Sequence, residues 1–381
     1  MTRLLICTAC LLAASEAAAA CPQDVVWPDP DWAEAPVPAG PAALAFDEYL
    51  FTVVGADDER LGIRTDGVVL VHRGRIIHER YARGYGRDNR HLAWSVSKSF
   101  LNAMVGVGVL RGDLALDDSI CDHYPALDDE VCEISIDDLL GWGSGLDWNE
   151  GYESEPYYLS SVIAMLYGVG VGDMAAFTAA QGLAVPPGTR YSYSSGDSTL
   201  LAAVLAGALD PSLADSFPWD FVFDPIGMDS AVFERDRAGT FIGSSYVYAT
   251  PRDLARFGYL FLRDGCWAGE RLLPEGWVAL STEPNPSFLA GDNDEWAASR
   301  DAVPGRHWWL GLPLPDRMHA SVWPSAPPDT YAAEGHWGQS IHIIPSADLV
   351  IVRTADDRDT TAVDDDRFLA LALALAAEDP P

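Results

Sequence analysis

Segments with a strand pattern lie at both ends of this chain, whereas the pattern of its middle is helical. Runs of β-branched residues predict one hairpin over 67–72 and 76–81 and a second over 340–344 and 349–353. Apolar periodicity predicts helices over 41–54, 96–110, 135–140, 197–207, 250–263 and 367–377. If the terminal hairpins pair, they must enclose the helical middle, so we predict an α+β fold with one sheet domain built from both termini.

This order divides the chain into four expected parts. Residues 1–20 form a leader, and residues 21–40, rich in Pro, Asp and Trp, form an extended N-terminal segment. A sheet domain comprises residues 41–110 plus 300–381, and a mainly helical domain, 111–299, is inserted into it.

Residues 1–20 have the pattern of a secretory signal peptide. Arg3 precedes an apolar run from Leu4 to Ala14, and four alanines at 17–20 resemble a cleavage site. The run is too short to span a bilayer, and the rest of the sequence offers no candidate span. We therefore predict an exported protein, periplasmic or secreted. Cys21 follows the cleavage site directly, so a lipid anchor on it is an alternative, although Ala18 matches the lipidation pattern poorly.

Four cysteines remain after such a leader is removed: Cys21, Cys121, Cys132 and Cys266. An even number in an exported chain favours disulfides. Cys121 and Cys132 enclose a short loop and are the natural pair, which leaves Cys21 with Cys266. No cysteine or histidine spacing predicts a metal site.

The formal net charge of the chain is −33 at pH 7. Such a surface repels nucleic acid and anionic membranes, so we expect neither as a partner. It modestly favours neutral or cationic substrates over anionic ones. A solvated acidic surface without functional meaning is the simpler interpretation, and the sequence does not indicate an oligomeric state.

Lys98 is the only lysine of the chain, which otherwise uses arginine wherever it has a Lys or Arg side chain. Ser95 lies three residues earlier and so on the same face of a helix, while Ser97 and Ser99 point elsewhere. A neutral lysine can take the proton of a serine hydroxyl and make it a nucleophile, and burial makes a lysine easier to deprotonate. Arginine stays protonated and cannot do this. The alternative is a surface lysine that follows a serine by chance.

Four ordered stretches resemble motifs of the serine β-lactamase and penicillin-binding-protein superfamily. Ser95-Val96-Ser97-Lys98 resembles its Ser-x-x-Lys motif, and Ser144-Gly145-Leu146 resembles the Ser-Gly-Leu stretch of class C-like members. Residues 187–195 resemble its Pro-Gly-Thr-x-Tyr-x-Tyr-Ser-(Asn/Ser) pattern, and residues 335–339 stand where it has a Lys-Thr-Gly or His-x-Gly strand. The resemblance spans about residues 45–375 and is strongest to the branch of esterases, amide hydrolases and 6-aminohexanoate-dimer hydrolases.

This resemblance implies a β-lactamase/transpeptidase-like fold, an antiparallel sheet flanked by helices, with no cofactor or metal. It makes Ser95 the nucleophile, Lys98 its base and Tyr193 a proton relay whose pKa neighbouring cations would lower. The backbone N–H groups of Ser95 and Gln339 would form the oxyanion hole. Tyr193 could instead be a core aromatic side chain.

The expected substrate pocket is lined by His336, Trp337, Gly338, Ser195, Trp148 and Tyr152. The His336 side chain would assist proton transfer or hydrogen-bond Tyr193, or it could be a packed strand residue. Trp148 and Tyr152 could form a lid or an ordinary surface loop. Asp197 is expected to cap the helix over 197–207.

We therefore predict an exported serine hydrolase that cleaves a small-molecule ester or amide through an acyl-enzyme on Ser95. The alternatives are a D-alanyl-D-alanine carboxypeptidase or β-lactamase, and a catalytically idle ligand-binding protein of the same fold. Ser195 and His336-Trp337 stand where β-lactamases carry asparagine and Lys-Thr, which favours neutral esters or amides over antibiotics. A Ser-His-Asp hydrolase is disfavoured because the chain has no Gly-x-Ser-x-Gly elbow.

Overall fold

The computed structural model describes residues 21–379, apart from 38, 57, 59, 60, 128, 153–155, 157, 158, 292–301, 318 and 360. The signal peptide predicted over 1–20 therefore lies outside the described residues. So does the expected domain boundary at residue 300.

The main sheet has eight strands in the order β1-β3-β2-β13-β12-β11-β10-β9. Neighbouring strands are antiparallel except for the parallel pair β1–β3. The strands are β1 (Ala33–Glu34), β2 (Thr65–His72), β3 (Arg75–Tyr81), β9 (Val303–Pro304), β10 (Trp309–Leu310), β11 (Tyr331–Gly335), β12 (Gln339–Ile344) and β13 (Leu349–Ala355). Because β2 pairs with β13, the two predicted terminal hairpins join in one sheet, and the α+β prediction is confirmed.

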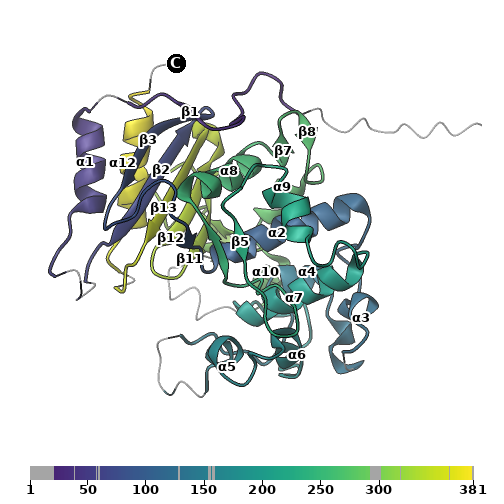
Figure 1. The fold of residues 1–381 in the computed structure, drawn as a ribbon. Coiled ribbons are helices and arrows are strands. Elements are labelled where there is room, and N and C mark those ends of the chain that lie inside the picture. The colour runs from purple at the N-terminus through teal and green to yellow at the C-terminus, as the bar shows by residue number, and fades with distance from the viewer. Residues whose placement is uncertain are drawn as a thin grey trace, which may run out of the picture.

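Helices cover both faces of this sheet (Figure 1). On one face, α1 (Pro41–Phe51) and α12 (Asp365–Ala376) bury an apolar cluster against the strands, in which the ring centres of Phe46 and Phe368 lie 5.9 Å apart. On the other face lie α2 (Val96–Arg111) and α8 (Pro251–Leu262). A Cβ on Gly258 of α8 would lie 2.6 Å from a methyl group of Val350, so this glycine lets the helix lie close to the sheet.

The remaining elements form the mainly helical part. Its helices are α3 (Ile120–His123), η2 (Asp129–Glu133), α4 (Ile136–Leu140), α5 (Ser161–Tyr167), α6 (Met174–Ala179), α7 (Ser195–Ala208), η4 (Trp219–Phe223), α9 (Trp277–Ser281) and α10 (Pro286–Ala290). Short strands accompany them: β4 (His91–Leu92), β5 (Val232–Phe233), β6 (Val247–Ala249), β7 (Cys266–Trp267) and β8 (Glu270–Arg271). Two 3-10 turns, η5 (Pro315–Arg317) and η6 (Pro345–Ala347), lie in the C-terminal part.

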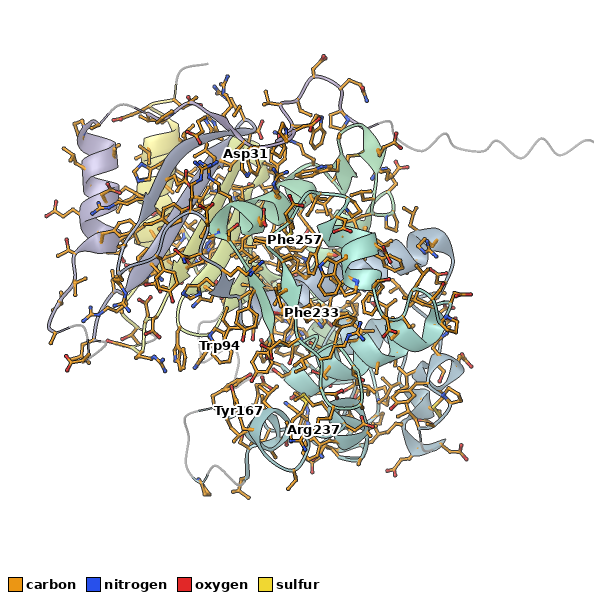
Figure 2. The ribbon with its side chains drawn as sticks, viewed as in Figure 1. Asp31, Trp94, Tyr167, Phe233, Arg237 and Phe257 are labelled. Atoms are coloured by element: carbon orange, nitrogen blue, oxygen red, sulfur yellow. A yellow bond between two sulfur atoms is a disulfide. The ribbon has the colours of Figure 1, made fainter. Side chains whose placement is uncertain are left out.

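The range expected for the inserted domain does not lie wholly apart from the sheet. Helix α8 falls inside 111–299 but packs on β2, β12 and β13. Aromatic side chains such as Phe257 of α8 and Phe233 of β5 belong to one continuous core between sheet and helices (Figure 2).

The helix predicted over 197–207 begins earlier than expected. Its N-cap is Ser194, whose Oγ accepts the backbone N–H of Asp197, so α7 starts at Ser195. The prediction that Asp197 caps the helix is therefore wrong. Ser194 is free to cap because its backbone is extended, whereas Asp197 already lies in the first turn with its carboxylate accepting Ser144 Oγ. Helix α8, in the range predicted over 250–263, is capped by Thr250, whose Oγ1 accepts the backbone N–H of Asp253.

Two disulfides tie loops to the core. Cys121 is bonded to Cys132, and Cys21 is bonded to Cys266 at the start of β7. These are the pairs named from the sequence. Among the described residues, we find neither a helix with the length and hydropathy needed to cross a membrane nor a metal-binding group of three His, Cys, Asp or Glu side chains.

Candidate active site

Ser95 lies where the chain turns from β4 into α2. Trp94 before it has φ +48°, an uncommon conformation for a bulky residue. The turn brings Ser95 against the end of β11. A Cβ on Gly335 would collide with the carbonyl oxygen of Ala93 and lie 3.2 Å from the backbone nitrogen of Ser95. Gly335 therefore lets the end of β11 lie directly beside the N–H group of the candidate nucleophile.

Lys98 lies one turn further along α2 and is fully enclosed, with 2% of its surface exposed. Its Nζ is 3.0 Å from each of three oxygens: Ser95 Oγ, Ser195 Oγ and the backbone carbonyl of Ser244. An ammonium group has three N–H bonds, so these oxygens satisfy all of its donors. Ser97 and Ser99 point elsewhere, as predicted, to Val247 and His307.

Burial lowers the pKa of Lys98 from 10.5 to about 8, while the negative charge of Glu150 opposes this shift. The three hydrogen-bond partners of the amine are hydroxyl and carbonyl oxygens rather than carboxylates. With this pKa about one tenth of Lys98 is neutral at pH 7, and the neutral amine is the state that a general base requires.

Tyr193 precedes the cap of α7 and lies over Lys98, with Nζ 4.9 Å from the centre of its ring. Its hydroxyl hydrogen-bonds Ser95. The expectation that cations lower its pKa is wrong: burial, and then the charge of Glu150, raise the pKa of Tyr193 well above 10, and only the bond to Ser95 opposes them. The phenol stays protonated because burial and the nearby carboxylate charge both disfavour the phenolate.

Glu150 belongs to this site although no sequence motif names it. Its Oε1 accepts the Ser195 hydroxyl at 2.5 Å and the Tyr152 hydroxyl at 3.0 Å. Its Oε2 accepts the backbone N–H of Ser195 at 2.9 Å and Trp148 Nε1 at 2.5 Å. The only available signal was a carboxylate placed between two aromatic residues already assigned to the pocket.

The loop that carries Glu150 packs on the first turn of α7. The Trp148 ring lies so close to Gly196 that a Cβ there would be 2.6 Å from it. The Tyr152 hydroxyl also lies 3.2 Å from Ser195 Oγ, and its ring stacks on His336 with centres 5.2 Å apart. The structure therefore brings Trp148, Tyr152, Ser195 and His336 together, and their role as a substrate pocket stays a prediction.

The turn between β11 and β12 contributes the other wall. The centre of the His336 ring lies 4.5 Å from the ring centre of Trp337 and 5.7 Å from that of Trp94. Trp337 has φ +61° and Gly338 has φ +87°, so this is a tight left-handed turn. The side-chain amide of Gln339 donates to the carbonyls of His336, Trp337 and Ala355 and so holds the turn in place.

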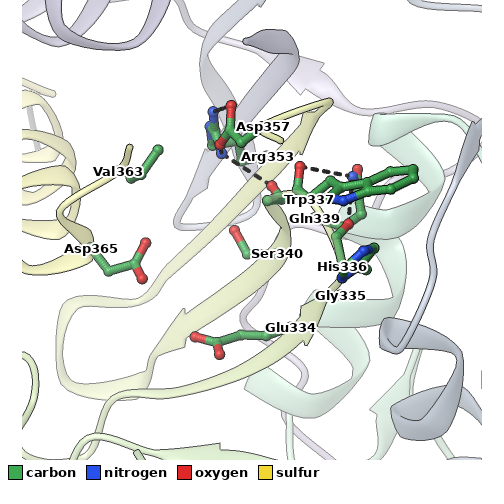
Figure 3. Close-up of a pocket in the computed structure, with 11 residues that line it drawn as sticks. Glu334, Gly335, His336, Trp337, Gln339, Ser340, Arg353, Asp357, Val363 and Asp365 are labelled. Atoms are coloured by element: carbon green, nitrogen blue, oxygen red, sulfur yellow. Dashed lines mark hydrogen bonds and ion pairs between the residues drawn. The ribbon is translucent and has the colours of Figure 1, made fainter. Parts of the chain in front are cut away.

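The same turn lines a cavity of about 220 Å³ together with β13 and the segment before α12 (Figure 3). Its charged side chains include Arg353, which is ion-paired with Asp357 at 2.7 Å, and Asp365. In the close-up, the turn residues His336 and Trp337 lie at the right, whereas Val363 and Asp365 lie at the left. Ser95 and Lys98 are not among the described residues that line this cavity.

His307 supports the site from behind and was also missed, because no motif surrounds it. Its Nδ1 is 2.9 Å from the carbonyl oxygen of Lys98, and its Nε2 is 3.1 Å from Ser198 Oγ. A carbonyl only accepts, so Nδ1 carries the proton and Nε2 accepts the Ser198 hydroxyl. Burial, and then the charge of Lys98, lower the pKa of His307 to about 3, so the ring is neutral and links α2 to α7.

Residues 50–376 match the family model described as beta-lactamase, which covers most of the chain. The chain belongs to the beta-lactamase family. A relative from Paenarthrobacter ureafaciens, 6-aminohexanoate-dimer hydrolase, is 25% identical over 306 residues, which span 78% of this chain and 74% of that protein. The predicted family resemblance is confirmed.

Solved structures show that this beta-lactamase-family chain also has the family's fold. A Bacillus anthracis protein, provisionally described as a 6-aminohexanoate-dimer hydrolase, superposes with a TM-score of 0.67 at 20% identity, over 92% of this chain and 89% of that one. A penicillin-binding-protein homologue from Caulobacter crescentus gives 0.61 at 14% identity, over 88% and 96%. The family and its relatives make this chain a serine hydrolase of the beta-lactamase-like family.

Proposed function

We propose that this chain is exported and hydrolyses an ester or amide bond of a small molecule through an acyl-enzyme on Ser95. The observation that carries the proposal is the position of Lys98. The only lysine of the chain is buried 3.0 Å from Ser95 Oγ, and burial lowers its pKa to about 8. A serine next to a buried, partly neutral amine is a serine that can be deprotonated as it attacks.

In the proposed reaction, neutral Lys98 takes the proton of Ser95 as Oγ bonds to the carbonyl carbon of the substrate. Negative charge develops on the carbonyl oxygen, which accepts the N–H of Ser95 and one N–H of the β11–β12 turn, for which Gln339 stays the predicted donor. The neutral phenol of Tyr193 donates its proton to the leaving group and recovers one from Lys98. Water then attacks the acyl group by the reverse sequence of proton transfers.

The surroundings of Ser95 favour a neutral, partly apolar substrate. Aromatic rings of Trp94, His336, Trp337 and Tyr152 contact one another beside the nucleophile. Burying an apolar group of the substrate against these rings would stabilise its binding. The charge of Glu150 disfavours an anionic group at the same place.

Export is supported by the leader pattern of residues 1–20 and by the two disulfides. Disulfides persist in oxidising compartments and are rare in the cytosol. Intact mass of the mature protein from the producing cell would test this: cleavage before Cys21 is expected, and a mature chain that retains residues 1–20 would contradict export.

The enzymatic proposal is tested with a short-chain p-nitrophenyl ester on wild type and Ser95→Ala. We expect turnover and, in the first seconds, a mass increase of one acyl group on wild type, with both absent from the variant. Folded wild type without adduct or turnover, on esters, amides and penicillin alike, would support an idle ligand-binding protein instead. A long-lived adduct with penicillin alone would favour the carboxypeptidase or β-lactamase alternative.

A further inference from the structure

Two serine hydroxyls compete for Lys98. Ser95 Oγ and Ser195 Oγ each lie 3.0 Å from its Nζ. In the sequence, Ser95 precedes Lys98 and Ser195 follows it. The third neighbour, the carbonyl of Ser244, is only an acceptor. Nothing in the distances alone determines which serine the lysine would deprotonate.

The competition matters only when Lys98 is neutral. A neutral amine has two N–H bonds and one electron pair, so it can accept a proton from one hydroxyl only. One N–H is used by the carbonyl of Ser244. If Ser195 pointed its proton at the amine, the remaining N–H would turn toward Ser95 and the site would be arranged for the wrong serine.

Glu150 distinguishes the two serines. Its Oε1 lies 2.5 Å from Ser195 Oγ, and a carboxylate only accepts hydrogen bonds, so the single proton of Ser195 points to Glu150. Ser195 Oγ is then left with lone pairs for Lys98. The remaining electron pair of the amine can face only Ser95.

We propose that Glu150 is a positioning residue that acts through Ser195: by taking the proton of Ser195 it directs the base Lys98 to Ser95. The inference rests on the proposed roles of Ser95 and Lys98. With its proton held by the carboxylate of Glu150, the Ser195 hydroxyl acts toward Lys98 as an acceptor only.

The neighbours of Glu150 make a glutamine substitution informative. Oε2 faces two groups that only donate, the N–H of Ser195 and Nε1 of Trp148. In Glu150→Gln the amide oxygen must stay there, which turns the amide NH₂ toward Ser195 Oγ and the Tyr152 hydroxyl. An NH₂ donor in that place would push the proton of Ser195 toward Lys98. The nearly isosteric variant thus reverses the hydrogen bond without removing the loop's anchor.

Other charged and titratable groups around this chain of bonds bear on its pH dependence. Lys98 faces the Tyr193 ring and His307, which lies behind its carbonyl. Asp197, one turn along α7, is buried, and its pKa is raised to about 7 by burial and, to a smaller extent, by Glu150. Tyr152 contacts Glu150 directly. Removing the charge of Glu150 makes the Lys98 ammonium less stable, so the acid limb of the acylation profile should move to lower pH.

The test is a double-mutant cycle on the rate of Ser95 acylation by a p-nitrophenyl ester, measured above the acid limb. Glu150→Gln is expected to slow acylation about tenfold in the wild-type background, because a hydrogen bond of the base is misdirected. In a Ser195→Ala background there is no competing proton, and the same substitution should change the rate less than twofold. Asp147→Asn, an exposed carboxylate of the same loop, is the matched control and should change neither rate.

An equal loss from Glu150→Gln in both backgrounds would show that Glu150 only anchors the loop, and the inference would be overturned. No loss in either background would overturn it as well. A shift of the acid limb to lower pH in both backgrounds would show that the substitution changes the pKa of Lys98. An unchanged acylation rate would then not mean that Glu150 is too far from Lys98 to affect it. If wild type formed no adduct on Ser95, the proposed function itself would have failed.

Discussion

Two buried cations in this protein have pKa values that are shifted in opposite directions. Lys98 donates to three neutral oxygens, and burial lowers its pKa to about 8. Arg252 of α8, 6% exposed, binds Glu79 through Nε at 2.8 Å and a terminal nitrogen at 2.5 Å, and it also binds Glu34. These acidic partners raise the pKa of Arg252 above its usual value.

The direct partners of a buried cation, more than its depth, therefore decide whether it keeps its proton. Carboxylates in contact with the cation offset the free-energy cost of its desolvation, whereas hydroxyl and carbonyl oxygens offset only part of that cost. In the Lys98 site the one nearby carboxylate, Glu150, is separated from the amine by Ser195. Lys98 can therefore release its proton, whereas Arg252 keeps its proton and links Glu34 of the N-terminal segment to Glu79 of β3.

Replacing Lys98 by arginine should have the largest effect, because it gives the site the permanent cation found at Arg252. A guanidinium cannot accept the proton of Ser95, so acylation should fall by about 10³-fold. The rate of adduct formation on Ser95, followed by intact mass, measures this. An acylation rate within tenfold of wild type would remove Lys98 as the base.

Acylation by wild type should depend on pH in the way that the lowered pKa requires. The reactive form is neutral Lys98, so the rate should rise tenfold per pH unit up to about 8 and level off above it. At pH 6 it should be about 100-fold below the plateau. Because burial keeps the pKa of Tyr193 above its usual value, the phenol should add no basic limb below pH 10. A flat profile between pH 6 and 9 would contradict the assignment.

The stability of the fold should show the same titration. In the unfolded chain Lys98 titrates at its ordinary 10.5, and in the folded chain at about 8, so between these values the unfolded state binds more protons. Its contribution to stability is therefore unfavourable below pH 8 and is relieved as pH rises toward 10.5. Relative to Lys98→Met, wild type should gain about 2.5 kcal/mol in free energy of unfolding between pH 7 and 10.

Urea unfolding of both proteins at the two pH values gives this difference, and groups common to both cancel. A constant difference would mean that Lys98 keeps an ordinary pKa in the folded state.

The smallest effect is expected from Arg252→Lys, the reverse exchange. An ammonium keeps the charge but loses the two-point contact with Glu79, which should cost about 1 kcal/mol of stability, measured by urea unfolding. Acylation of Ser95 should be unchanged. A loss of acylation comparable to that of Lys98→Arg would show that the two regions are not independent.

Most of the fold was predictable because it depends on local patterns. The hairpins at 67–81 and 340–353 have β-branched runs bounded by turn residues, and β2 and β13 pair as their order required. The start of α7 was misplaced by two residues because Ser194, Ser195 and Asp197 are all capping residue types. Which of them caps depends on backbone geometry that the sequence does not state.

The candidate site was predictable where its residues stand in fixed spacing. Ser95 and Lys98 share a helix turn, and Tyr193 and Ser195 flank the cap of α7, so motifs could name them. Glu150 and His307 could not be named, because they come from a loop and from the segment after β9 and reach Lys98 or Ser195 only in space. The direction of the Tyr193 pKa shift was wrong for a related reason: burial is a property of the packed site.

The sequence by itself determined the two terminal hairpins, the longer helices, the family motifs and the fact that one removable positive charge stands beside a serine. The tertiary structure alone decided the protonation chemistry of that charge. Desolvation depends on how many atoms surround the Lys98 amine, and hydrogen-bond direction depends on which donors and acceptors meet there. Both depend on residues that are distant in the chain. His307, for example, is 209 positions from Lys98.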